Sequence, residues 1–405
     1  MSPLAITGMS SISGLGVGTE SFEHALFAGD TAIAPVGFEA SGTRSRMAAG
    51  IVDFDATEYI PAGRLRRIDR IGQLAVACSR LVAEDAGLAA DALDRDEMGV
   101  SLGSTTAGLH TLVRYLDGLI ARGVDGASAM DFSNTVGNAA ASLCGIELGL
   151  RGVNATLNYK EASAAAAVAH ASRVLLAGQA RALITGGVED IEATYFAVHD
   201  AFGVLAWDAG DGEVSRPFDS KRNGFVLGTG AYLLVLETVE SAAERAALPH
   251  GHLLGLGATS GPCRLNAWPT DGAPLVRCMR DALASAGREA SDVAVVFASA
   301  NSTLALDRIE AEAIATVFGP FGVPVVAVKG ALGECGASSA AALQAAILSL
   351  RRRRLPPTAG LIERDAACAV DVSPAVRELP AVDGRVALVN SFASGGTCYS
   401  LVVGA

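Results

Sequence analysis

Short runs of consecutive hydrophobic residues, each ending at a glycine- or serine-containing turn, recur along the whole chain. Within a run nearly every position is apolar, whereas a strand with one face in water alternates apolar and polar residues. The runs therefore predict buried strands that are covered by helices on both faces. They lie at residues 4–8, 181–187, 231–236, 293–298, 325–328, 386–389 and 399–403.

Between these runs, apolar residues recur at the three- and four-residue spacing of helices with one buried face. Helices are expected at residues 66–88, 137–149, 162–178, 275–288, 307–318 and 338–352. Strands that alternate with helices indicate an α/β fold. The later strands repeat the order and spacing of the earlier ones, so we expect two pseudo-repeated halves, residues 1–250 and 251–405, that join near residues 248–251.

The composition is apolar: half of the 405 residues are hydrophobic and the mean hydropathy is +0.37. An apolar surface is usually covered by another subunit, so we expect a dimer. No apolar stretch is long enough to span a bilayer, and the first residues lack the basic segment of a signal peptide. We therefore expect a cytoplasmic protein that does not bind membranes.

Charge narrows the range of partners. The formal net charge of −12 argues against nucleic acid or an anionic membrane as a partner, and against this surface alone holding an acidic carrier protein. Four consecutive arginines at residues 351–354 are interpreted as cations at a helix C-terminus, with a docking patch as the alternative.

Cysteine and histidine do not form metal-binding motifs. The seven cysteines have no paired spacing, which indicates buried free thiols, and the six histidines are not at ligand spacing. We expect no metal site.

Six short motifs, in order along nearly the whole chain, resemble those of the β-ketoacyl carrier-protein synthases. They lie at residues 7–9, 67–75, 147–152, 217–228, 307–313 and 390–397. Each motif alone is a weak signal, but together and in order they are a strong one. The resemblance implies the thiolase fold, in which two βαβαβαββ halves form a five-layered α-β-α-β-α sandwich, and a dimeric protein.

Synthases of this family use one cysteine and two histidines, and the resemblance places all three positions in this sequence. The cysteine position is Glu161, in the Asn-Tyr-Lys-Glu-Ala-Ser segment at residues 158–163 that leads from a strand into a helix. The histidine positions are Ser299 and Glu334, while the family's lysine is retained as Lys329. A carboxylate is a far weaker nucleophile than a thiolate, a serine is a weak donor, and an ionised glutamate would repel a developing enolate. We expect no catalytic residues and no condensation by this chain.

The resemblance also assigns a gating loop and a set of tunnel residues. The gating loop carries Ala393 and Ser394 where a Gly-Phe pair is usual. The tunnel-gating positions, which follow a glycine-rich turn, fall on Leu109, Leu112 and Leu116. Their spacing places them on one face of a helix, which suits contact with an acyl chain. An ordinary stripe of core residues is the alternative interpretation.

An intact scaffold without the cysteine and the histidines is similar to the chain-length factors of type II polyketide synthases. This resemblance implies that the chain completes the acyl tunnel of a catalytic ketosynthase subunit, in a heterodimer or a higher oligomer. Acyl chains would arrive at the complex on the phosphopantetheine of an acyl carrier protein, so no cofactor is expected on this chain. Chain-length factors usually carry glutamine at the cysteine position, and Glu161 departs from that pattern. The product, aromatic or polyene, is left open.

Other roles stay open as well. The chain could be a malonyl-carrier decarboxylase or initiator, or an enzyme in which Glu161 and Glu334 converge as an acid/base pair. For Glu161 itself we expect either hydrogen bonds from the amides of the helix that starts near Ala162 or an ion pair with Lys329.

Overall fold

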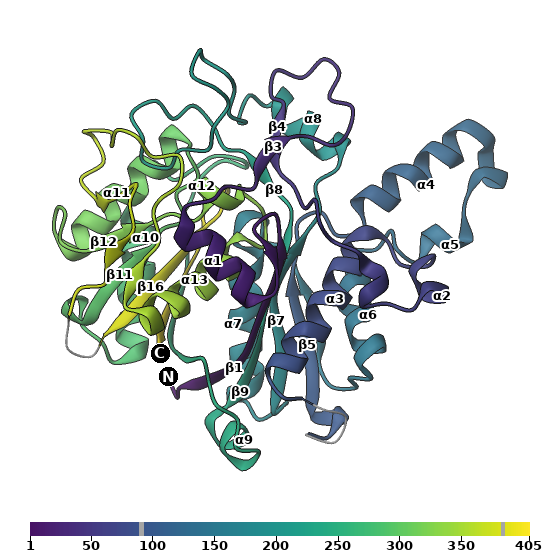
Figure 1. Cartoon of the computed structure of the whole chain (residues 1–405), viewed down its shortest axis with the longest axis horizontal. Coiled ribbons are helices and arrows are strands. Elements are labelled where there is room, and N and C mark those ends of the chain that lie inside the picture. The colour runs from purple at the N-terminus through teal and green to yellow at the C-terminus, as the bar shows by residue number, and fades with distance from the viewer. Residues whose placement is uncertain (89–92, 382–384) are drawn as a thin grey trace.

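The two halves of the chain build sheets with the same strand order. The computed structural model in Figure 1 describes residues 1–88, 93–381 and 385–405. The main strands are β1 (Leu4–Ser13), β5 (Met98–Gly103), β6 (Asn154–Leu157), β7 (Ala182–Glu189), β9 (Gly230–Thr238), β10 (Gly251–Ser260), β11 (Val293–Phe297), β12 (Pro324–Val326), β16 (Val386–Phe392) and β17 (Thr397–Gly404). The first half has the order β6-β5-β7-β9-β1, and the second has β12-β11-β16-β17-β10. Counted along the chain, both orders run third, second, fourth, fifth, first, so the expected pseudo-repeat is present.

A short antiparallel ladder joins the two sheets, because residues 4–6 of β1 pair with residues 251–253 of β10. The boundary between the halves at residue 250 stays a proposal, and β10 begins one residue after it. Smaller strands add to the edges or form separate sheets. They are β2 (Gly16–Val17), β3 (Ile33–Pro35), β4 (Met47–Ala49), β8 (Leu227–Gly228), β13 (Arg354–Leu355), β14 (Asp371–Val372) and β15 (Arg377–Glu378).

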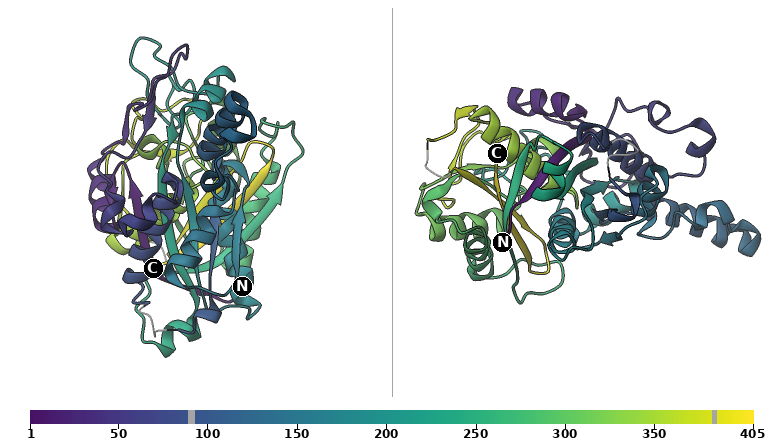
Figure 2. Two further views of the ribbon diagram at one scale, coloured as in Figure 1. Left: turned by 90° about the vertical axis from the view of Figure 1, so that its right-hand side faces the viewer. Right: turned by 90° about the horizontal axis from the view of Figure 1, so that it is seen from below.

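Helices form three layers, one between the two sheets and one on the outer face of each sheet (Figures 1 and 2). The helix α7 (Ser163–Leu176) packs with α13 (Ser338–Arg352) between the two sheets. Outside them, α3 (Arg70–Asp85) and α6 (Ala139–Leu148) cover the first sheet, while α10 (Ala273–Ala286) and α11 (Leu304–Phe318) cover the second. The two central helices are alanine-rich and almost wholly buried, because each packs against a sheet on both sides. The architecture is the five-layered thiolase fold that the resemblance implied.

The remaining helices are shorter or lie at the periphery. They are α1 (Thr19–Ala28), α2 (Ala62–Leu65), α4 (Leu109–Arg122), α5 (Ala129–Phe132), α8 (Ala193–Ala201), α9 (Val239–Glu244), α12 (Lys329–Leu332) and the 3-10 turns η1 (Ala56–Glu58), η2 (Arg95–Glu97), η3 (Gly123–Gly126), η4 (Lys160–Ala162) and η5 (Ala290–Asp292). None of the helices in the described part of the chain has both the length and the apolar character needed to cross a bilayer. The helices α4 and α5 project from the body beyond the first sheet (Figures 1 and 2). We call residues 109–136 the arm.

The seven predicted strands and six predicted helices are all present; the helix at residues 338–352 has the predicted ends, and the ends of the others are shifted. The helix expected from residue 66 begins at Arg70, because the Asp69 side chain accepts a hydrogen bond from the Gly72 N–H at 3.0 Å and caps the helix there. Among the main strands, the hydrophobic pattern missed β5, β6 and β10. The strand β6 has four residues, and β10 alternates buried and partly exposed positions, so neither forms a continuous apolar run.

Candidate functional site

Glu161 lies on the turn that links β6 to the buried helix α7, as the sequence predicts. It is the middle residue of η4. The Ser163 hydroxyl braces this turn: it donates to the Lys160 carbonyl at 2.7 Å and accepts from the Tyr159 N–H at 2.9 Å. Lys160 has a φ of 51°, in the left-handed region that few residues other than glycine adopt.

The carboxylate of Glu161 is bound by the loop between β16 and β17. It accepts from the Ser394 N–H at 3.1 Å and from the Ser394 hydroxyl at 3.0 Å. Both partners expected from the sequence are wrong. The first amides of α7 are already used, since the Ala164 N–H donates to the Gly336 carbonyl at 2.9 Å. Lys329 forms a different ion pair.

Lys329 pairs with Glu334. Its ammonium donates to Glu334 Oε2 at 2.7 Å and to the Ser299 carbonyl at 2.8 Å, and the Asn301 amide donates to the same Oε2 at 2.9 Å. Lys329 is 4% exposed and Glu334 is 2% exposed. The structure thus brings Ser299, Lys329 and Glu334 together in one buried network.

Burial disfavours the charge on Glu334 and raises its pKa to about 7, although Lys329 acts in the opposite direction. The charge of Glu161 also raises this pKa. The acid/base pairing of the two carboxylates stays a prediction. Within the described chain, Oε1 of Glu334 has no hydrogen-bond partner. Glu334 is therefore a buried group that changes its protonation state near neutral pH, and in its ionised form it has no hydrogen to donate.

The hydroxyl of Ser299 forms hydrogen bonds with the backbone of β16. It donates to the Phe392 carbonyl at 3.3 Å and accepts from the Phe392 N–H at 2.9 Å. The Ser299 N–H donates to Glu310 at 2.9 Å, and burial raises the pKa of Glu310 to about 7. The single hydroxyl hydrogen of Ser299 is thus used within the fold.

Two residues near Glu161 were missed by the sequence analysis. Tyr195 and His199 lie on α8 with their ring centroids 4.2 Å apart, and His199 Nδ1 is 2.9 Å from the Tyr195 carbonyl oxygen. Burial lowers the pKa of His199, and the nearby charge of Glu161 opposes this shift. Burial raises the pKa of Tyr195, and the charges of Glu189 and Glu161 raise it further. A lone histidine on an unpredicted helix gives no sequence signal.

The predicted gating loop closes against the turn that carries Glu161. Ala393 is 2% exposed, and Ser394 binds Glu161 as described. The Lys160 ammonium donates to Asn266 Oδ1 in a neighbouring loop and to Ser394 Oγ at 3.4 Å. Two loops and the turn are therefore held together.

The three predicted tunnel leucines lie on α4, at the start of the arm. Leu109 and Leu112 are half-buried, and Leu116 is 41% exposed. Thr111 is the buried residue of α4. The leucines are therefore not part of a core within this chain, and the alternative interpretation as a core stripe is wrong.

The arm exposes several large apolar side chains. These are Leu116, Ile120, Val124, Met130, Phe132 and Val136. Ile120 and Val124 are 82% and 84% exposed. Exposed apolar side chains on a protruding element are typical of interaction surfaces.

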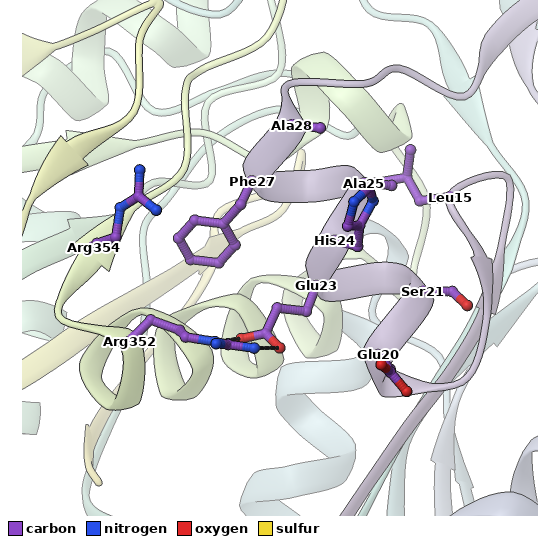
Figure 3. A pocket seen from close by; sticks show the side chains of 10 residues that line it. All are labelled: Leu15, Glu20, Ser21, Glu23, His24, Ala25, Phe27, Ala28, Arg352 and Arg354. Carbon is purple, nitrogen blue, oxygen red and sulfur yellow. Dashed lines mark hydrogen bonds and ion pairs between the residues drawn. The ribbon is translucent and has the colours of Figure 1, made fainter.

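A separate surface pocket of about 790 Å³ lies beside α1 (Figure 3). Its lining residues are Leu15, Glu20, Ser21, Glu23, His24, Ala25, Phe27, Ala28, Arg352 and Arg354. The guanidinium of Arg352 lies against the carboxylate of Glu23, at 2.6 and 2.7 Å (Figure 3). Arg351 and Arg352 form the last turn of α13, so they are cations at a helix C-terminus as predicted. None of the predicted site residues lines this pocket.

Within the described residues, no group of three or more His, Cys, Asp or Glu side chains is placed to hold a metal ion. All seven cysteines are free thiols. Six are buried, but Cys263 is half-buried, so the expectation of burial fails there.

Comparisons with known proteins cover nearly the whole chain. The family models for the beta-ketoacyl synthase N-terminal and C-terminal domains match residues 1–242 and 250–361. The 3-oxoacyl-[acyl-carrier-protein] synthase 2 of Synechocystis sp. is 31% identical over 399 residues, which are 97% of this chain and 95% of that protein. The tetracenomycin polyketide synthase ketoacyl synthase beta subunit of Streptomyces glaucescens is 33% identical over 364 residues, 88% of each chain. The solved structure of the ishigamide ketosynthase/chain length factor matches with a TM-score of 0.92 and 30% identity, over 100% of this chain and 99% of that one.

Proposed function

Because the chain belongs to the β-ketoacyl synthase family, we propose that it is the non-catalytic partner of a ketosynthase in a type II polyketide synthase and sets product length. The proposal is carried by the three positions where the family resemblance places a cysteine and two histidines. Glu161, Ser299 and Glu334 occupy them. Each is held by hydrogen bonds within the chain.

These side chains are unsuited to decarboxylative condensation. A thiolate must take up the acyl chain, and imidazole donors must stabilise the enolate oxygen that forms as malonate loses carbon dioxide. The carboxylate of Glu161 is a poor nucleophile, and the hydroxyl hydrogen of Ser299 is already used by β16. Loss of one oxyanion donor lowers a rate by about 10²–10³-fold, and neither histidine position carries a histidine here.

The proposed ketosynthase partner would sit at the outer end of the first sheet. There β6 is the edge strand, and an edge strand presents unpaired backbone groups that another chain can bond. The arm projects from the same end (Figure 1) and exposes Ile120, Val124, Met130 and Phe132. A free edge beside exposed apolar side chains supports a heterodimer, or a higher oligomer built from it.

Leu109, Leu112 and Leu116 supply the proposed control of chain length. A partner seated against the arm would enclose these three leucines between the subunits, where their apolar side chains suit an acyl chain. The acyl chain would arrive on the phosphopantetheine of an acyl carrier protein. Since this chain has a net charge of −12, we propose that the ketosynthase provides most of the carrier-protein contact. The likeness to a structure named a ketosynthase/chain length factor supports the same role.

Co-expression with candidate ketosynthases tests this proposal. We expect the chain to co-purify with one of them as a heterodimer. The products of the pair, identified by mass spectrometry, should differ in length from those of the ketosynthase alone. A ketosynthase that makes the same products with and without the chain would overturn the proposal.

A second candidate function is decarboxylation of malonyl-carrier protein. The observation that favours it is His199, an imidazole on α8 within electrostatic reach of Glu161. Acetyl-carrier protein formed by the isolated chain, and lost in a His199→Ala variant, would favour this candidate.

A further inference from the structure

Glu189, the last residue of β7, is a buried carboxylate surrounded by uncharged donors. It is 1% exposed. It accepts from the N–H groups of Thr105 at 3.0 Å, Thr106 at 2.7 Å and Gly336 at 2.9 Å, from the Ser104 hydroxyl at 3.1 Å, and from the Thr106 hydroxyl. A buried carboxylate with this many donors also fixes the groups that donate to it.

Most of these donors belong to the turn that leads into the arm. This turn, residues 103–108, continues directly into α4. The Thr106 carbonyl accepts from the Leu109 N–H at 2.8 Å, and Leu109 is the first residue of α4. Glu189 is therefore linked to the first tunnel leucine through a single residue, Thr106.

The same carboxylate lies next to the turn that carries Glu161. The Thr105 hydroxyl donates to the Lys160 carbonyl at 3.1 Å. A Cβ placed on Gly336 would lie 2.5 Å from Glu189 Oε2, 2.5 Å from Thr105 Oγ1 and 3.1 Å from the Lys160 carbonyl oxygen. The turn at residues 103–108, the turn that carries Glu161 and the segment at Gly336 are thus packed against one another around Glu189. There is no room for one more atom, so a shift of one segment must displace the others.

We propose that Glu189 is a positioning residue for chain length: its carboxylate fixes the turn before α4 and thereby sets where Leu109 and Leu112 stand in the acyl tunnel. This inference rests on the proposed function, because the tunnel is part of that function. If Glu189 served the fold alone, its loss would lower stability without affecting the arm in particular.

The variant Glu189→Gln tests this role with little change in shape. Glutamine keeps one accepting oxygen but replaces the other with an NH₂ donor. Because backbone N–H groups, which cannot accept, donate to both oxygens of Glu189, the NH₂ would face a donor at either position and the turn would have to shift.

The matched control is Glu237→Gln. Glu237 lies on β9 and is also fully buried. Its carboxylate accepts from Thr7, Ser241 and Arg245, which are outside both the turn and the arm. Both variants remove a buried carboxylate, but only Glu189→Gln touches the arm.

Amide hydrogen exchange of the full chain separates positioning from stability. In Glu189→Gln we expect the N–H groups of Leu109 and Leu112 to exchange at least about tenfold faster than in the natural protein, and in Glu237→Gln at the natural rate. Unchanged exchange at these two positions in Glu189→Gln overturns the inference. If Glu189→Gln does not fold, Thr106→Val takes its place, because it removes one hydroxyl donor and keeps the carboxylate. Faster exchange of the Leu109 and Leu112 N–H groups in Thr106→Val supports the inference, and unchanged exchange overturns it.

Product length with a ketosynthase partner is the second readout, with Leu112→Gly measured alongside. We expect Glu189→Gln to shift or broaden the length distribution and Glu237→Gln to leave it unchanged. A shift with Leu112→Gly but none with Glu189→Gln overturns the positioning role and leaves the proposed function standing. No shift with either variant contradicts the proposed function and, with it, this inference.

Discussion

The Glu161 carboxylate and Ser394, 233 residues apart in the sequence, are joined by hydrogen bonds of 3.1 Å from the N–H and 3.0 Å from the hydroxyl. Both positions depart from the pattern of the active synthases, in which the resemblance places a cysteine and a phenylalanine. A phenylalanine side chain could not donate to the carboxylate. The two departures are therefore complementary, because the serine donates to the carboxylate from both its N–H and its hydroxyl and so links the β16–β17 loop to the turn before α7.

Restoring a cysteine is expected not to restore condensation. In Glu161→Cys the thiol returns, but Ser299 and Glu334 still provide no imidazole for the enolate. The variant should also be less stable by about 1–3 kcal/mol, because the two hydrogen bonds from Ser394 are lost. Mass spectrometry of acyl- and malonyl-carrier proteins incubated with the variant measures condensation. Urea unfolding measures the change in stability. Appearance of a β-ketoacyl product would show that the histidine positions are not what prevents the reaction.

The stability of the folded chain is expected to fall as the pH rises towards neutrality. Burial raises the pKa of Glu334 from its ordinary value of 4.5 to about 7. Between these values the folded state keeps a proton that the unfolded chain has released. This contribution to the free energy of unfolding is therefore full below a pH of about 4.5 and is lost as the pH rises through about 7. For one group the free energy of unfolding falls by at most about 1.4 kcal/mol per pH unit.

Urea unfolding at several pH values between about 5 and 7 measures this slope. Glu334→Gln cannot ionise and should flatten it. Part of the slope should remain, since burial also raises the pKa of Glu310 to about 7. A slope that is the same in the variant and in the natural protein would exclude Glu334 as its source.

Shortening a leucine of α4 is expected to lengthen the partner's product. Leu109→Gly and Leu112→Gly each remove a whole side chain from the proposed tunnel wall, and mass spectrometry reads the product. Glycine within a helix costs about 1 kcal/mol, so size-exclusion chromatography must show that the heterodimer is intact. Leu176→Gly on α7, where the leucine is 45% exposed, is the control and should leave the product unchanged. An unaltered product from both arm variants in an intact heterodimer would count against the tunnel assignment.

Charges placed on the arm are expected to prevent heterodimer formation without unfolding the chain. Ile120 and Phe132 are 82% and 60% exposed, so glutamate at either position should change the stability of the isolated chain by only about 0.5 kcal/mol. An unpaired carboxylate buried in an interface weakens binding much more. Leu248→Glu is the control, because Leu248 is 90% exposed and lies outside the arm. If Ile120→Glu and Phe132→Glu still co-purify with the ketosynthase as the control does, the arm is not the interface.

The layers of this fold could be predicted because burial shapes composition. The continuous apolar run at residues 386–389 became β16, and the alanine-rich segment at residues 162–178 became the central helix α7. Glu161, Ser299 and Glu334 were assigned by the family resemblance, not by the hydrophobic pattern. In contrast, the four-residue strand β6 carries no continuous apolar run and was missed.

The contacts of Glu161 could not be predicted because they depend on loops that meet only in the fold. Local sequence does not show that the Ala164 amide is taken by the Gly336 carbonyl, which leaves Glu161 to bind Ser394. Similarly, His199 could not be predicted because it lies on α8, and the sequence of α8 has no apolar stripe. Only one residue of this helix is buried.

Incubation of the purified chain with acyl- and malonyl-carrier proteins, with and without a ketosynthase, tests the central claim most directly. Mass spectrometry of the carrier-bound products provides the readout. We predict no β-ketoacyl product from the chain alone, and from the pair a polyketide whose length differs from that made by the ketosynthase alone. A β-ketoacyl product formed by the chain alone would contradict the claim that it has lost catalysis and retained only the shaping of a partner's product.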